Sequence, residues 1–262
     1  MAQLLTILLA GSLMIGGALL HPPTEPLPGI GRHLARPIVL PFLWRGLQDT
    51  KRTGSIQDYV AQGQTLMKFI PEWSIGHVHF ANQLAYDGVQ TAASPEIGVD
   101  RLGEAIQLLE RAMQNHPAGS ETYLKAAAAL LYVQCNKHPA VAEAFARRLG
   151  NPFQLAETYL RRIPRFRDSA FLQDQIPFLF IDGIPHQILL AGNDWRDVAS
   201  RAVATATNLI KKIRNQNLTA PWQLSLGNLN DYLQGSSDIS MRNLAKDPRL
   251  AKIVKALNSR VR

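Results

Sequence analysis

The sequence predicts an all-α protein in which helical hairpins follow one another along the chain. Apolar residues recur with helical spacing in runs of about 12–16 residues, and short breaks containing Pro, Gly or Asn separate these runs. Ala and Leu dominate the composition while runs of β-branched residues are few, which favours helices over an all-β fold. With 46% hydrophobic and 18% charged residues, the 262-residue chain is too apolar to be a disordered polypeptide.

The first element is an apolar segment at the amino terminus. Residues 4–20 contain no charged side chain, and the run ends at a His-Pro-Pro sequence where proline stops a helix. At about 1.5 Å per residue this helix reaches roughly 25 Å, which is short but sufficient for a bilayer. We therefore expect residues 1–21 to form a single transmembrane anchor. A cleaved signal segment and a buried helix of a folded domain are the alternatives.

The next segment is basic and rich in proline. Residues 22–41 hold six prolines and two glycines, which predicts an extended spacer between membrane and folded domain. Arg32, Arg36 and Arg45 follow the apolar segment and no basic residue precedes it. The positive-inside rule then places the folded part on the cytoplasmic side, with a periplasmic or other extracytoplasmic location as the alternative.

Residues 42–150 read as helical hairpins in series, because each apolar-periodic run ends at a break and the next run follows at once. A polar stretch at 88–99 interrupts this alternation, and we expect it to be a long loop within one hairpin. The expected helices span residues 42–53, 56–70, 73–87, 101–115, 122–134 and 140–149.

The pattern of small and large residues in this region resembles tetratricopeptide repeats. Residues 105–117 match the second helix of such a repeat, including its closing proline, and the helix that follows matches the first. The matching residues are Phe80, Ala81, Leu84, Ala105, Leu109, Ala112, Pro117, Tyr123, Ala127 and Leu130. Pro71 and Pro117 lie 46 residues apart instead of the family's ~34, which the expected loop explains, and Tyr59 and Leu66 stand where small residues are usual.

The resemblance, which covers less than half of the chain, implies a helical solenoid whose concave surface binds other proteins or peptides. First-helix residues line that surface in the family. By helix position, the residues of this chain that the resemblance places there are Asn82, Gln83, Lys125 and Gln134.

Residues 151–262 form a second helical region with a less regular rhythm. The run 178–184 contains an Asp-Gly pair followed by proline, so it fits either a hairpin of short strands or a kinked pair of buried helices. Pro164 precedes a basic run, Arg-Phe-Arg, at 165–167. The expected helices span residues 153–163, 194–215, 221–234 and 244–257, with Asp194 as the cap of the second of them.

Positive charge is concentrated in the carboxyl-terminal half. Residues 1–120 carry 8 Lys and Arg against 9 Asp and Glu, whereas residues 121–262 carry 20 against 11. In the final helix Arg249, Lys252 and Lys255 are candidates for contact with anionic lipid or an acidic partner. An apolar stripe runs opposite them, so a helix that caps the fold explains the same pattern. It consists of Leu250, Ile253, Val254 and Leu257.

Signals for catalysis are weak. His77 and His79 are two residues apart, which directs them to different faces of a helix, and Cys135 ends an Ala- and Leu-rich run typical of a core. The sequence contains no phosphate-binding glycine loop and no nucleophile elbow. We therefore expect no catalytic, cofactor or metal site, and nucleic acid is disfavoured because basic residues do not alternate with aromatic ones.

Taken together, these patterns predict a membrane-anchored scaffold that binds other proteins. One alternative is a protein that binds an anionic membrane surface or an acidic partner through its basic half. The other is an enzyme with an unidentified site between residues 42–150 and 151–262.

Overall fold

The computed structural model describes residues 29–213, 215–236 and 239–261, and within these ranges the chain is all-helical with no strand. Twelve α-helices, packed against one another, cover most of the described residues. The chain divides into two compact units, Met1–Pro71 and Glu72–Arg262. Each unit is described by itself.

In the first unit, α2 (Gly29–Thr53) packs against α3 (Ile56–Phe69). The expectation of an extended spacer over 22–41 is wrong from residue 29 onward, since α2 runs through Pro37 and Pro41. Both prolines lie at exposed positions of α2. Here the Arg36 Nε donates to the Phe69 carbonyl over 2.8 Å and joins the two helices.

The start of α3 is fixed by a capping box. The Ser55 hydroxyl accepts from the Asp58 N–H over 3.2 Å, and the Asp58 carboxylate accepts from the Ser55 N–H over 3.3 Å. Two N–H groups that would lack helical partners are thereby satisfied.

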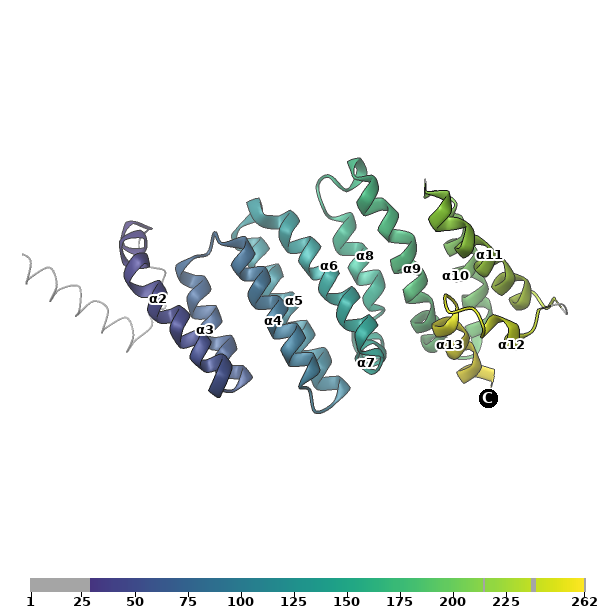
Figure 1. Cartoon of the computed structure of the whole chain (residues 1–262), viewed down its shortest axis with the longest axis horizontal. Helices are drawn as coiled ribbons and strands as arrows, with labels where there is room; N and C mark the ends of the chain where they lie inside the picture. The colour runs from purple at the N-terminus through teal and green to yellow at the C-terminus, as the bar shows by residue number, and fades with distance from the viewer. Residues whose placement is uncertain (1–28, 214, 237–238, 262) are drawn as a thin grey trace, which may run out of the picture. The chain divides into compact units, whose positions relative to one another are not determined.

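The second unit begins with two rows of helices (Figure 1). One row places α4, α6 and α8 side by side, and the other places α5, α7 and α9 side by side, while α4 also packs on α5 and α6 on α7. This arrangement is compatible with a helical repeat fold. The bounds are α4 (Ser74–Gln90), α5 (Pro95–Asn115), α6 (Ser120–Lys137), α7 (Pro139–Leu149), α8 (Pro152–Arg161) and α9 (Ala170–Leu190).

The expected long loop at 88–99 does not exist. Helix α4 continues to Gln90 and α5 begins at Pro95, so only residues 91–94 connect them. The Ser94 hydroxyl accepts from the Ile97 N–H over 3.3 Å and caps α5, which starts with proline at a position that tolerates it. The wide spacing of Pro71 and Pro117 therefore reflects longer helices.

The small and large residues that carry the family resemblance are all in the core of this array. Each is at most 3% exposed, apart from Pro117. Close approach of the helices explains why small residues recur. A Cβ added to Gly98 of α5 would lie 2.9 Å from a methyl of Val141 on α7.

Both alternatives predicted for residues 178–184 are wrong. Pro177 and Pro185 lie inside α9, which is one helix of 21 residues. Both prolines are buried, and α9 packs against α7, α8, α10 and α13. The Asn151 amide, which caps α8, also donates to the Gly183 carbonyl over 2.9 Å. Packing and this hydrogen bond hold α9 helical despite the two prolines.

The remaining helices are α10 (Trp195–Ile210), α11 (Gln216–Leu233), α12 (Met241–Leu244) and α13 (Ala251–Val261), and three single 3₁₀ turns lie at Pro117–Gly119, Phe166–Asp168 and Gly192–Asp194. Asp194 precedes α10 but makes no side-chain cap hydrogen bond, contrary to expectation. The expected helix 244–257 is two helices, because Asp247-Pro248 disfavours helical backbone between them.

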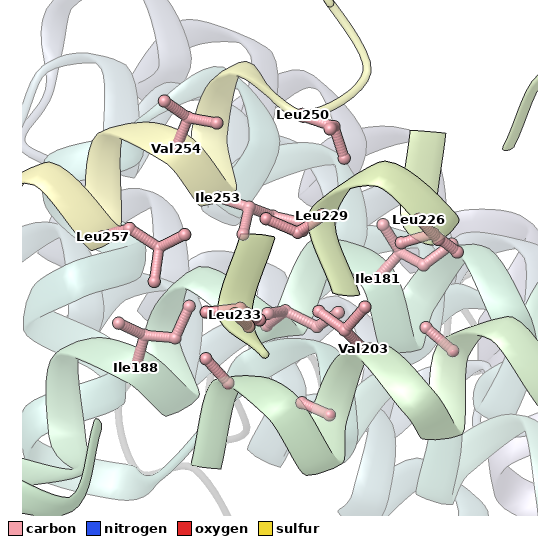
Figure 2. Packing of buried hydrophobic residues seen from close by; sticks show 14 of the residues in the cluster. Ile181, Ile188, Val203, Leu226, Leu229, Leu233, Leu250, Ile253, Val254 and Leu257 are labelled. Carbon is pink, nitrogen blue, oxygen red and sulfur yellow. The ribbon is translucent and has the colours of Figure 1, made fainter. Parts of the chain in front are cut away.

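The core of this region joins α9, α10, α11 and α13 (Figure 2). Ile188 and Val203 face Leu233, and the side chains of α13 close the cluster from the other side. The expected apolar stripe of the last helix is confirmed as a packing surface. Its residues Leu250, Ile253, Val254 and Leu257 are 1%, 2%, 3% and 0% exposed.

Among the described residues, no helix is both long enough and apolar enough to cross a bilayer. The predicted anchor at residues 4–20 lies outside the described residues.

Candidate functional site

An apolar groove between α6 and α9 is the candidate site. Its volume is about 510 Å³, and its lining comes from α6, the end of α8 and the first half of α9. Tyr132, Phe171 and Phe178 supply three aromatic rings, and Lys125 supplies one charge. The other lining residues are Ala128, Ala129, Val133, Leu160, Ser169, Leu172, Gln175 and Leu179.

Two helical stripes form the walls of the groove. On α6, Lys125, Ala129 and Tyr132 follow the spacing of one helix face, and Asn136 continues it one turn later. On α9, residues 171, 175, 178 and 182 have the same spacing. The arrangement places Leu160 of α8 between the two stripes as part of the lining.

Two of the three aromatic rings of this groove are open to solvent, while Phe178 is partly buried. Phe171 is 74% exposed and Tyr132 is 39% exposed. The Tyr132 ring also meets the buried Phe153 edge-on at a centroid distance of 6.3 Å, which supports one side of the wall. A groove with two exposed aromatic side chains is typical of a surface that buries a partner's apolar side chains.

A polar cluster that joins three helices lies beside Tyr132, toward the carboxyl-terminal end of the α6 stripe. The Lys252 Nζ of α13 lies 3.6 Å from the Asp182 carboxylate of α9, and it donates a hydrogen bond to the Asn136 amide oxygen of α6. Burial raises the pKa of Asp182, and the Lys252 charge together with hydrogen bonds from Asn136 and Tyr132 opposes that rise. Burial also raises the pKa of Tyr132, and the nearby Asp182 charge adds to the effect.

The opposite end, the mouth of the groove, carries exposed charges. The Lys125 Nζ lies 2.6 Å from the Glu121 carboxylate one helical turn away. The hydrogen bond and charge of Lys125 lower the pKa of Glu121, and the Arg165 charge lowers it further. Arg165 belongs to the connection between α8 and α9, which lies at the same end of the second unit as the start of α6 (Figure 1).

The structure brings only one of the four predicted partner-binding residues into this groove. Lys125 lines it, whereas Asn82 and Gln83 are half-buried on α4 and do not. The prediction for Gln134 is wrong, because its side chain is 0% exposed. Helix α6 packs against α4, α5, α7 and α8, so its inner face is covered. Neither amide atom of Gln134 has a hydrogen-bond partner among the described residues.

The three predicted anionic-surface residues have different surroundings. Lys252 is engaged with Asp182 and Asn136 in the polar cluster beside Tyr132. The Arg249 guanidinium lies 3.3 Å from the Asp247 carboxylate, and Lys255 is exposed on α13. Lys252 thus acts as a link between helices, which sequence periodicity alone does not reveal.

The residues considered for chemistry are in core or surface positions. Cys135 is 3% exposed, and burial raises the pKa of its thiol to about 12. His77 is buried edge-on against Tyr123 while His79 is exposed, as their spacing predicts. No group of three or more His, Cys, Asp or Glu side chains that could hold a metal is present in the described ranges.

Sequence reasoning missed most of the groove. Phe171, Phe178 and Asp182 have a helical spacing that could have identified them, but the reading of 178–184 as a turn or kink concealed it.

No protein-family model matches this chain, and comparisons with curated proteins and with solved structures likewise find no match.

Proposed function

We propose that this protein is an interaction scaffold that binds a segment of another protein in the groove between α6 and α9. The observation that supports the proposal is the exposure of Phe171 and Tyr132 around a groove of about 510 Å³. Apolar side chains of a partner would release water from these rings, which is the main favourable contribution in such interfaces. Binding in this way requires no bond chemistry.

The fold supports a binding role by presenting the groove on a rigid framework. Helices α4, α6 and α8 in one row and α5, α7 and α9 in the other give each element several packed neighbours. We further propose that this double row is tetratricopeptide-like, since the residues of the resemblance are those that fill its core. Lys125 is then the residue of the predicted binding surface that contacts the partner.

Attachment to a membrane is part of the same proposal. A single anchor formed by residues 4–20, with the folded part on the cytoplasmic side, would hold the partner close to the membrane and raise its local concentration. The charge-free composition of this segment is the observation behind it.

The test is site-directed photocrosslinking in cells followed by binding to the purified partner. A photoreactive phenylalanine analogue replaces Phe171 in one variant and the exposed Leu218 of α11 in the control. A protein crosslinked from position 171 and not from 218 is purified, and its affinity for the full chain is measured. We expect Ala129→Glu, which puts a charge into the groove, to abolish this binding, and Ala204→Glu on exposed α10 surface to leave it intact. Equal sensitivity to both substitutions would refute the groove as the binding site.

A further inference from the structure

A cluster of arginines lies at the mouth of the groove and has no role in the fold described above. Arg161 ends α8, and the connection to α9 carries Arg162, Arg165 and Arg167; all four are exposed. We call this segment, residues 161–167, the arginine loop. Residues 157–168 hold these four arginines and only two carboxylates, Glu157 and Asp168.

Three of the arginines surround a second hollow. Its volume is about 540 Å³, and Arg161, Arg162 and Arg167 line it together with Phe166 and Gln173. Planar guanidinium groups that converge on one space are suited to bind carboxylates, each through two parallel hydrogen bonds.

The guanidinium groups are held in place by neighbouring rings. Arg161 stacks on Phe166 at 5.7 Å and Arg162 on Tyr159 at 5.8 Å from the ring centroids. Glu157 also pairs with Arg161 at 2.7 Å. A cation that is already oriented loses less conformational entropy when it binds an anion.

The backbone of the arginine loop is fixed as well. The Gln173 side-chain amide of α9 donates to the carbonyl of Arg167 over 2.6 Å and to that of Phe166 over 3.4 Å. The loop is therefore part of the same framework as the groove, and its position relative to Phe171 is set by α9.

Residues that line the hollow and residues that line the groove are sequence neighbours at two points. Leu160 lines the groove and Arg161 the hollow, while Leu172 lines the groove and Gln173 the hollow. Arg165 acts from the same loop on Glu121 at the groove mouth. Arg165 therefore lies near the groove mouth, which brings the arginine loop within reach of a polypeptide segment that leaves the groove at this end.

We infer that the partner's segment carries acidic side chains beside its apolar anchor and that the arginine loop binds them. This inference rests on the function proposed above and specifies the partner's chemistry. A polyanion such as nucleic acid fits less well, because its charges run along the whole strand, whereas Lys125 is the one charged residue among the described residues that line the groove. An apolar segment with acidic residues at one end meets the arginines there and the aromatic rings beyond.

Selection from a random peptide library on the purified full chain tests the inference. The expected sequences combine large apolar residues with an Asp or Glu cluster on one side. A variant with Arg161, Arg162 and Arg167 replaced by Gln should select the apolar residues without the acidic cluster. A control with Arg201, Lys211 and Lys212 replaced by Gln removes the same charge from exposed positions of the α10 region and should select the same sequences as the native chain.

Affinity measurements on one selected peptide then quantify the effect. We expect the Arg161/162/167 variant to bind about tenfold more weakly at low salt, from three partly exposed ion pairs, and the control to bind within about twofold. The difference should shrink as salt rises.

The outcomes separate this inference from the function on which it rests. If the selected peptides are apolar without acidic residues, and their binding is lost with Ala129→Glu, the inference about acidic side chains is overturned while the groove remains the binding site. Selection that Ala129→Glu does not affect, or that yields no apolar anchor, would overturn both. Tighter binding of a 15-nucleotide oligo-dT than of the selected peptide, lost in the same arginine variant, would assign the loop to nucleic acid instead.

Discussion

The array formed by α4–α7 and the cluster formed by α9–α13 are both helical and both bury small and large residues, but small residues make up more of the buried core in the array. Alanines such as Ala81, Ala105 and Ala127 form a large share of the array's core, whereas the cluster buries a few alanines among more numerous Ile, Leu and Val side chains. Small residues allow backbones to approach and give regular rows. In the cluster, Ile, Leu and Val side chains fill most of the space between α9, α10, α11 and α13 (Figure 2).

The two regions should therefore fail in opposite ways, the cluster through cavities and the array through overcrowding. The groove lies where they meet, with α6 from the array and α9 from the cluster as its walls. Four substitutions test this contrast, in order of decreasing effect on stability.

The largest effect is expected from a cavity in the cluster. Leu257 is 0% exposed, and Leu257→Ala should lower the free energy of unfolding by about 2–5 kcal/mol. Leu224→Ala serves as the control, since Leu224 is 69% exposed on α11 and its loss should matter little. Thermal and urea unfolding of the full chain measure both. Equal effects of the two substitutions would mean that α13 does not pack as described.

Overcrowding in the array is the next largest effect. Ala127 is 2% exposed, and Ala127→Leu should cost about 1–3 kcal/mol because the facing helices have to move apart. Ala129→Leu, on the exposed face of the same helix, is the matched control and should leave the melting temperature nearly unchanged. An unchanged melting temperature for Ala127→Leu would show that the array is loosely packed and that the contrast between the two regions does not hold.

The success of sequence reasoning follows the same division. The spacing of Ala105 and Ala112 on α5 and the position of Ala127 on α6 predicted which side chains are buried, because each helix has one phase that turns its small residues inward. It could not predict that α4 and α5 extend across the polar stretch 88–99, since polar residues on an exposed helix face resemble a loop. In the cluster, the prolines of α9 hid a helix that only its packed neighbours make stable.

The candidate site was predictable only in part for a related reason. The exposed position of Lys125 followed from its place on a helix, but the groove depends on α9, whose helical character was not foreseen. Gln134 was misplaced because sequence spacing does not show how many neighbours cover one helix. The link from Lys252 to Asp182 and Asn136 joins residues far apart in the chain and leaves no local pattern.

That link gives a pH-dependent contribution where the two regions meet. Burial raises the pKa of Asp182 in the folded state above its ordinary value. The folded protein then holds this proton more tightly, so the contribution of Asp182 to stability is most favourable at low pH and is lost as the pH rises through the folded-state pKa. From pH 4 upward, we therefore expect the melting temperature of the native chain to fall relative to that of the Asp182→Asn variant. A difference that does not vary with pH would show that the carboxyl is not desolvated.

The smallest effect on stability, and the most informative one for function, is expected at the groove. Phe171 is 74% exposed, so Phe171→Ser removes little buried area and should change the free energy of unfolding by no more than about 0.5 kcal/mol. The same substitution removes an aromatic wall that a partner would cover, and truncation of a central aromatic contact costs about 2 kcal/mol or more in binding. Thermal unfolding and titration of a selected peptide, performed on one preparation, measure both quantities. If the Phe171 ring serves binding, Phe171→Ser weakens the affinity and leaves the stability unchanged. A ring that contributes only to folding predicts the reverse, and that result would place the binding surface elsewhere on the array.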